Sequence, residues 1–339
     1  MKQIKVGVIG CGRIGRLHIH NILKHSNVQL VAVSDINIDS ILPSIKHLPL
    51  SYTTDNYEDI ISDESINAVF ICTPTNTHAQ IIQKAAQKKK HVFCEKPVSF
   101  SYEETKEVIE VAEKENIKLQ IGFNRRFDHN FHKVKNLVVE GEIGTPHILK
   151  ITSRDPEPPS ESYIQSSGGL FIDMSIHDFD MARYIMESEV VEVFATGANL
   201  INPAFKNYDD IDTAVITLKF ENGSIGVIDN SRKAVYGYDQ RIEVFGSDGC
   251  ITVANERPTT LEISTKKETK VDLPHYFFLE RYQKAYEKEV ISFIQSIIDD
   301  RPILCTGYDG LQAERIAYAA KESLKRGIPV RLEQPLTIS

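Results

Sequence analysis

The segment that most constrains the fold is the apolar run at residues 4–9, followed at once by Gly10-Cys11-Gly12-Arg13-Ile14-Gly15. A strand that enters a GxGxxG turn and then a helix is typical of dinucleotide-binding domains. Gly10 permits the tight turn, Gly12 lets the backbone approach a pyrophosphate, and Gly15 allows the helix to lie close to the strand. The phosphates would meet the positive end of that helix. A purely structural glycine turn is the alternative.

A carboxylate lies at the right distance beyond this loop. Asp35 stands about 20 residues after Gly15, the spacing typical of the acidic residue in this motif, at the end of the strand pattern at residues 30–34. It can accept hydrogen bonds from the hydroxyls of an adenosine ribose and would repel a 2′-phosphate. Ile36 and Asn37 follow, with no arginine in the usual place to neutralise that phosphate, so the sequence favours NAD over NADP.

Short apolar runs alternate with amphipathic stretches through the first 122 residues. Strands are predicted at residues 4–9, 30–34, 68–72, 91–94 and 118–122, and helices at 14–24, 77–88 and 102–115. Ser101 and Glu104 have the spacing of a capping box before the last of these helices. Strand and helix in alternation predict an α/β domain, residues 1–122, built as a Rossmann doubly wound parallel sheet.

The pattern changes in residues 123–339, which we expect to form a second domain. A helix is predicted at 131–139, strands at 146–153, 214–220, 224–232, 240–246 and 250–253, and closing helices at 279–298 and 308–325. The alternation in 214–220, followed by Glu221-Asn222-Gly223-Ser224, indicates a hairpin. The domain is therefore predicted to be α+β, with a large, mainly antiparallel open sheet. The sheet face that helices leave bare is expected to join copies into a homo-oligomer, a tetramer or a dimer.

Composition excludes several classes of partner. The formal net charge of −8 argues against nucleic acid, and Lys88, Lys89 and Lys90, the one cationic run, are interpreted as a solvated helix end. No segment approaches the ~18 apolar residues of a membrane span. The cysteines are odd in number and none are spaced as CxxC, which predicts neither disulfides nor a metal site and favours the cytoplasm; they are Cys11, Cys72, Cys94, Cys250 and Cys305.

Glu95-Lys96-Pro97 follows the strand at 91–94, at the sheet edge where ligands normally bind. Pro97 restricts Lys96 to an extended backbone. Its ammonium could stabilise the alkoxide that develops when a hydride leaves an alcohol. An ordinary surface lysine is the alternative.

A second candidate cluster lies in residues 168–180. If this segment is helical, Asp173, His177 and Asp180 share one face. The imidazole could accept a hydroxyl proton, and a nearby carboxylate would raise its basicity. The same spacing would suit two metal ligands or a structural pair, so spacing alone leaves these alternatives open.

These motifs stand together in the order found in one family. The glycine loop, Thr73-Pro74-Thr75-Asn76-Thr77-His78, Glu95-Lys96-Pro97, Gly122-Phe123-Asn124-Arg125-Arg126-Phe127 and the Asp173/His177 pair occur in that order. The sequence resembles the glucose-fructose oxidoreductase and inositol dehydrogenase family over essentially its whole length. Within it, residues 152–156, 176–184 and 234–241 resemble inositol 2-dehydrogenases.

The resemblance implies an NAD-dependent oxidoreductase acting on CH–OH groups, which oxidises a secondary hydroxyl of myo- or scyllo-inositol to the keto-inositol without a metal. It implies Lys96, Asp173 and His177 as catalytic residues, with His177 as the base. It places the cofactor against Gly10, Gly12, Arg13, Ile14, Gly15, Asp35, Thr73, Pro74, Asn76, His78, Glu95 and Lys96. It places the substrate against Lys96, Asn124, Arg125, Asp155, Asp173, His177 and Tyr236.

Two other functions stay open at this point. The same chemistry could act on another sugar or polyol, with NAD or NADP. A non-catalytic NAD-binding sensor or regulatory protein would keep the glycine loop but has no need for Lys96, Asp173 and His177.

Overall fold

The computed structural model describes residues 3–332. They form two compact units. The first comprises the residues up to 127 together with 284–312, and the second comprises 128–283 together with the residues from 313 onward.

The first unit is built on a six-stranded parallel sheet with the order β3-β2-β1-β4-β5-β6. Its strands are β1 (Ile4–Ile9), β2 (Val28–Ser34), β3 (Tyr52–Thr54), β4 (Ala68–Ile71), β5 (His91–Cys94) and β6 (Leu119–Ile121). Its N-terminal helices are α1 (Arg13–Leu23), α2 (Ile38–Ile45), α3 (Tyr57–Ser62), α4 (His78–Gln87) and α5 (Tyr102–Lys114). The predicted Rossmann sheet is confirmed, and β3 is the strand that the sequence patterns missed.

Helix α5 begins with half of the predicted capping box. The Ser101 hydroxyl oxygen accepts the backbone N–H of Glu104 at 3.4 Å. The Glu104 carboxylate, however, accepts from the hydroxyl of Ser99, whose oxygen in turn accepts the N–H of Ser101 at 3.0 Å. The Ser99 hydroxyl thus lies between the Glu104 carboxylate and the backbone N–H of Ser101, which bond directly to each other in a standard capping box.

Helix α10 (Gln283–Ile298) completes the core of the first unit. Val290, Phe293 and Ile294 are buried against the β-sheet, and the Phe293 ring meets that of Phe70 edge-on at 5.5 Å. The sequence division at residue 122 assigned this helix to the second domain. Its apolar face instead covers the parallel sheet, so the first unit is discontinuous in sequence.

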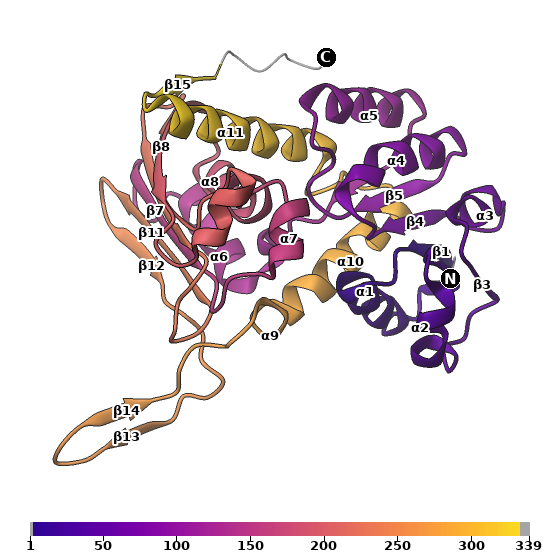
Figure 1. The fold of residues 1–339 in the computed structure, drawn as a ribbon, viewed down its shortest axis with the longest axis horizontal. Helices are drawn as coiled ribbons and strands as arrows, with labels where there is room; N and C mark the ends of the chain where they lie inside the picture. The colour runs from indigo at the N-terminus through magenta and orange to yellow at the C-terminus, as the bar shows by residue number, and fades with distance from the viewer. Residues whose placement is uncertain (1–2, 333–339) are drawn as a thin grey trace. The chain divides into compact units, whose positions relative to one another are not determined.

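The second unit contains a seven-stranded sheet with the order β12-β11-β7-β10-β9-β8-β15. Its strands are β7 (Pro146–Arg154), β8 (Val190–Ala198), β9 (Thr213–Phe220), β10 (Ile225–Ser231), β11 (Asp239–Gly246), β12 (Cys250–Val253) and β15 (Val330–Arg331). All neighbours pair antiparallel except β7 with β10. The mainly antiparallel sheet is therefore confirmed. A separate hairpin, β13 (Glu262–Ser264) and β14 (Thr269–Val271), projects from this unit (Figure 1).

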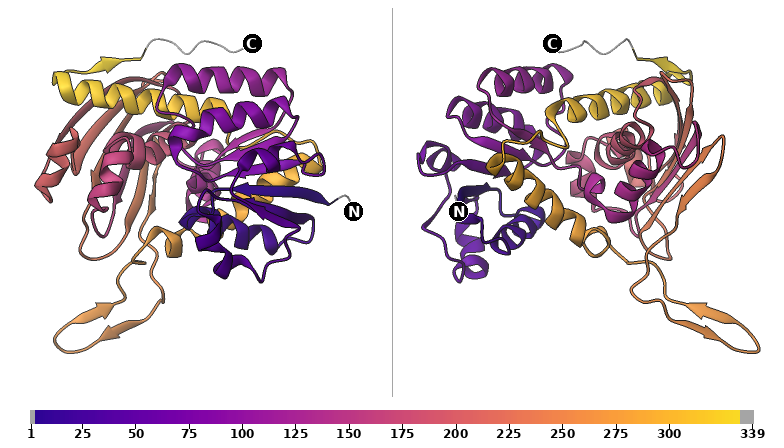
Figure 2. Two further views of the ribbon diagram at one scale, coloured as in Figure 1. Left: turned by 45° about the vertical axis from the view of Figure 1, so that its right-hand side comes forward. Right: turned by 180° about the vertical axis from the view of Figure 1, so that it is seen from behind.

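Helices cover one face of the large sheet (Figure 2). They are α6 (His129–Val139), α8 (Ile176–Met186) and α11 (Gly307–Arg326), with the short helices α7 (Glu161–Ser166) and α9 (Phe278–Arg281) nearby. Strand β9 shows the consequence, because its residues alternate strictly between buried and accessible. Within residues 3–332, no helix is both long and apolar enough to cross a bilayer.

Candidate active site

The glycine loop forms a cradle of bare backbone at the start of α1. Gly10 has a positive φ of 92°, and a Cβ on Gly15 would lie 1.9 Å from the carbonyl oxygen of Gly10. A Cβ on Gly12 would meet nothing within 4 Å, which leaves space above the first backbone N–H groups of the helix. This combination suits a pyrophosphate, since the loop packs tightly against the helix at Gly15 and leaves open space at Gly12.

Asp35 is joined to that loop directly. One carboxylate oxygen accepts the N–H of Cys11 at 2.8 Å, and the other accepts the N–H of Asn37 at 2.9 Å. Each oxygen keeps further acceptor capacity, which an adenosine ribose can use. The residues at this edge of the sheet therefore fit an NAD molecule.

Two further predicted cofactor segments are held together by His78. Its ring nitrogens lie 2.8 Å from the carbonyl oxygen of Pro97 and 2.8 Å from that of Thr73. Burial lowers the pKa of His78, while the two carbonyl contacts oppose that shift. The buried His78 side chain therefore links the loop after β4 to the loop after β5. On the same two loops, Pro74 and Asn76 are exposed and Lys96 is half-buried.

Asp173 and His177 lie where a π-helical turn, Phe171–Ser175, runs into α8. Both side chains are half-buried, whereas the other residues of α8 are buried. Asp180 is among those buried residues. Because α8 is enclosed on nearly all sides, Asp180 lies in the core, whereas Asp173 and His177 are the partly accessible members of the predicted cluster.

The Asp173 carboxylate is held by two donors. Arg232 donates to Oδ2 at 2.9 Å, and the Tyr163 hydroxyl donates to Oδ1 at 2.8 Å. Arg232 also donates to Asp155 at 3.2 Å and is only 4% exposed. Burial opposes the charge of Arg232, but Asp173 and Asp155 outweigh it and raise its pKa; the Asp173 charge, followed by burial, raises the pKa of Tyr163.

Sequence reasoning missed both Arg232 and Tyr163. Arg232 follows β10 directly, and an arginine at the end of an apolar strand pattern is the signal that could have drawn attention to it. Tyr163 lies in a short helix and carries no such signal.

The predicted substrate residues fall into three groups. Asp155 joins Asp173 through Arg232. The Tyr236 hydroxyl instead donates to Asp239 at 2.6 Å and accepts from Arg154 at 3.2 Å. Asn124 and Arg125 are buried in the 3-10 turn that follows β6 in the first unit. The convergence of Lys96 with Asp173 and His177 on one substrate stays a prediction.

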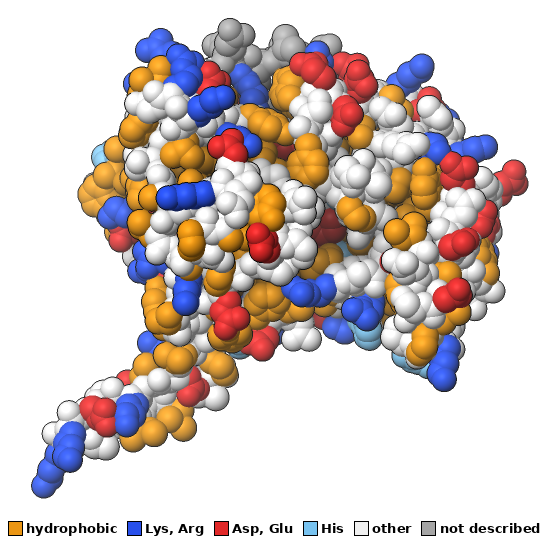
Figure 3. Space-filling model, viewed as in Figure 1, with side chains coloured by type: hydrophobic (Ala, Val, Ile, Leu, Met, Phe, Trp, Pro, Cys, Tyr) orange, Lys and Arg blue, Asp and Glu red, His pale blue; other side chains and the backbone are white. Residues whose placement is uncertain are grey.

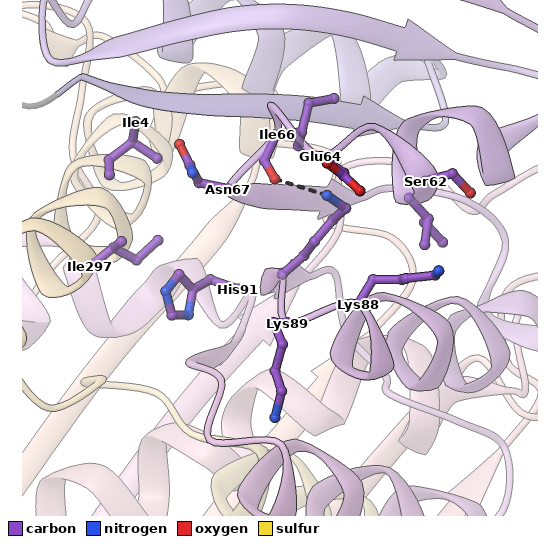
Figure 4. Close-up of a pocket in the computed structure, with 11 residues that line it drawn as sticks. Ile4, Ser62, Glu64, Ile66, Asn67, Lys88, Lys89, His91 and Ile297 are labelled. Carbon is purple, nitrogen blue, oxygen red and sulfur yellow. Dashed lines mark hydrogen bonds between the residues drawn. The ribbon is translucent and has the colours of Figure 1, made fainter.

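A pocket of roughly 490 Å³ lies at the opposite, amino edge of the parallel sheet (Figure 4). Ile4 and His91, which begin β1 and β5, line it together with the lysine run. Lys90 is 4% exposed and donates to the carbonyl oxygens of Asp63 at 2.7 Å and Ile66 at 2.9 Å. The run is thus a solvated helix end only at Lys88 and Lys89.

Comparison with known proteins assigns both parts of the chain to one protein family. Residues 4–123 match the oxidoreductase family with an NAD-binding Rossmann fold, and residues 131–252 match the GFO/IDH/MocA C-terminal domain.

Relatives match over nearly the whole chain. The uncharacterized oxidoreductase YrbE of Bacillus subtilis is 57% identical, covering 98% of this chain and 97% of its own. The myo-inositol 2-dehydrogenase of Thermotoga maritima is 46% identical, covering 98% and 99%. The crystal structure of scyllo-inositol dehydrogenase from Lactobacillus casei with bound NAD(H) and scyllo-inositol has a TM-score of 0.91 at 30% identity, covering 97% and 99%. The chain therefore belongs to the GFO/IDH/MocA family of NAD-binding oxidoreductases.

Proposed function

We propose that this protein is an NAD-dependent inositol 2-dehydrogenase, which oxidises one secondary hydroxyl of myo- or scyllo-inositol to the keto-inositol. Three relatives that are named as inositol 2-dehydrogenases support inositol as the substrate. The observation that carries the proposal is the Asp173 carboxylate, fixed by Arg232 and Tyr163 four residues before His177.

The proposed chemistry divides between three side chains. His177 takes the proton of the substrate hydroxyl, and Asp173 favours the imidazolium that results. The Lys96 ammonium stabilises the negative charge that develops on the substrate oxygen. Bound NAD would accept the hydride from the carbon that carries this hydroxyl. The alcohol thus becomes a ketone while NAD becomes NADH.

A cyclic polyol needs many hydrogen bonds and little apolar contact. Asp155 is well suited to accept from a ring hydroxyl, since Arg232 fixes one of its oxygens. Asn124 and Arg125 would supply donors from the first unit, and Tyr236 would supply a hydroxyl. We assign these four residues to the hydroxyl groups that do not react.

We also propose that copies of the chain associate through the bare face of the large sheet, and that the protein works in the cytoplasm. Phe245, Ile148 and Ile225 are direct neighbours across β11, β7 and β10 on that face. The projecting hairpin carries exposed apolar side chains as well (Figure 3). Covering these surfaces with a second copy would remove apolar area from water.

The direct test is a substrate panel followed by NADH absorbance. We expect myo-inositol or scyllo-inositol to give the highest kcat/KM, and NAD to be preferred to NADP. Faster turnover of glucose or another aldose would move the assignment to a different sugar. Tight NAD binding with no turnover of any polyol would favour a sensor.

A further inference from the structure

Three ionisable side chains meet behind the proposed nicotinamide site, all within the first unit. His18 of α1 places Nε2 2.7 Å from Oε1 of Glu95, which follows β5, and 3.9 Å from Oε1 of Glu289 in α10. The His18 and Glu289 side chains are fully buried, whereas the Glu95 side chain is 14% exposed. Glu95 is thus the member of the cluster that reaches the surface.

Glu289 has an unusual environment for a carboxyl group. Both of its side-chain oxygens are buried and have no hydrogen-bond partner. The neighbouring His18 ring itself packs between aromatic side chains, with its centroid 4.8 Å from that of Phe93 and 6.0 Å from that of Tyr286. Burial, followed by the charge of Glu95, raises the pKa of Glu289 well above its ordinary value, which favours the protonated form of a carboxyl group that has no hydrogen-bond partner.

Since Glu289 is fully buried, Glu95 is the better solvated of the two carboxyl groups. The His18 Nε2–H donates to one of its oxygens and fixes its direction. The other oxygen lies 3.0 Å from the position that a Cβ would take on Gly122, directly after β6. The carboxylate thus lies over the carboxyl ends of β5 and β6, and a side chain at position 122 would crowd it.

The sheet order places this carboxylate beside the second half of the dinucleotide. The glycine loop and Asp35 occupy the carboxyl ends of β1 and β2, and β4, β5 and β6 lie on the other side of β1. A dinucleotide whose adenosine lies over β2 extends across the switch point toward β4 and β5. Glu95 is therefore next to the nicotinamide, on the proposed placement of the cofactor.

We infer that Glu95, oriented by His18 and backed by the buried Glu289, makes the site prefer the oxidised, cationic nicotinamide to the reduced, neutral ring. A fixed carboxylate attracts a cation at short range and has no comparable attraction for the neutral ring. An ionised Glu289 would repel Glu95, whereas a protonated Glu289 leaves a single negative charge in the cluster. His18 and Glu289 act as positioning residues in this account. The inference rests on the proposed function, because it needs the nicotinamide at this edge.

The test compares the Kd values of NAD⁺ and NADH, measured by calorimetry without substrate. We expect Glu95→Gln to weaken NAD⁺ binding about tenfold and to leave NADH binding within about twofold. Glu287→Gln is the matched control, because Glu287 lies on the same helix α10 but pairs with Lys24 at the surface. It should change neither Kd.

Two further variants test the roles within the cluster. Glu289→Gln keeps a neutral group of the same shape, so the ratio of the two Kd values should stay near that of the wild type. His18→Gln removes the imidazole that fixes Glu95, and the ratio should fall toward that of Glu95→Gln. A purely structural role would weaken both cofactors equally. Unfolding temperatures identify any variant that fails to fold, and Glu95→Gln, being isosteric and partly exposed, still decides the question.

Three outcomes would overturn the inference. One is an equal loss of NAD⁺ and NADH affinity in Glu95→Gln. Another is a shift in Glu289→Gln as large as that in Glu95→Gln, which would mean that Glu289 is charged. The third is a stoichiometric metal ion in the purified protein that is lost in His18→Gln. Failure of the wild type to bind either cofactor would instead refute the proposed function itself.

Discussion

Arg232 donates to the Asp173 carboxylate at 2.9 Å across 59 residues of sequence, and the same guanidinium holds Asp155. One buried cation therefore positions two carboxylates of the proposed site. Arg232 is therefore a positioning residue of the proposed site.

Replacing Arg232 should impair both activity and stability. Arg232→Met leaves two carboxylates without their buried partner, which should lower the free energy of unfolding by about 3–5 kcal/mol and kcat/KM by about a hundredfold. Urea unfolding and NADH absorbance measure the two effects. Arg331→Met is the control, because Arg331 pairs with Glu192 at the surface and should cost less than about 1 kcal/mol. Equal effects of the two substitutions would contradict the role of Arg232.

Tyr163→Phe should have a smaller, pH-dependent effect. Loss of the hydroxyl that donates to Asp173 should lower kcat/KM by about threefold to tenfold at neutral pH. The raised pKa of Tyr163 stabilises the folded protein fully below about pH 10, the ordinary pKa of tyrosine, and this contribution is lost as the pH rises further. The stability difference between wild type and Tyr163→Phe should therefore shrink above about pH 10. A stability difference that grows above about pH 10 would contradict the raised pKa of Tyr163.

Lys96→Ala and His177→Ala should separate chemistry from cofactor binding. Each should lower kcat by about a hundredfold or more, because each removes a positioned charge or proton acceptor. The Kd of NAD should change little. Lys88→Ala, at an exposed position on the amino edge of the sheet, is the control for loss of a lysine. Near-normal kcat in both variants would exclude the proposed site.

Asp35→Ala should weaken NAD binding by about tenfold or more, since it removes the ribose acceptor and also the acceptor of the Cys11 N–H. Discrimination against NADP should decrease in the same variant, because a repulsive charge is lost. Asp39→Ala, in the exposed first turn of α2, is the matched control. An unchanged Kd for NAD in Asp35→Ala would refute the cofactor assignment.

Charge on the bare sheet face should disrupt self-association. Phe245→Glu and Ile225→Glu each place a carboxylate in the apolar row across β11, β7 and β10. Light scattering after size-exclusion chromatography should then show a smaller species than the wild type. Leu200→Glu changes an exposed leucine outside the strands and should have no such effect. A monomeric wild type would eliminate the proposed interface.

Local patterns were sufficient to predict both sheets and the glycine loop. The alternation in β9 and the strand-turn-helix order around Gly10 depend on neighbours in sequence, and both are confirmed. The same reasoning predicted the position of helix α10 in the chain but assigned the helix to the second domain, whereas it packs in the first unit. The apolar face around Phe293 could pack against either sheet. The sequence pattern therefore predicts a buried helix but does not identify the sheet that it covers.

The candidate site was less predictable because its contacts are long-range. No periodicity relates Arg232 to Asp173, and no local signal distinguishes Tyr163 from other tyrosines. The burial of Asp180 likewise depends on elements that enclose α8, and the helical spacing of Asp180 from His177 carries no information about them.

The return of α10 to the first unit has a consequence for protein synthesis. When residue 127 leaves the ribosome, Phe70 and Phe93 still lack the Phe293 ring that covers them. At translation rates of about 5–20 residues per second, the intervening segment delays that ring by roughly 8 to 30 seconds. The unit that is encoded first therefore stays incomplete until nearly all of the other has been synthesised, and the nascent chain presents an uncovered aromatic surface to cellular chaperones throughout that interval.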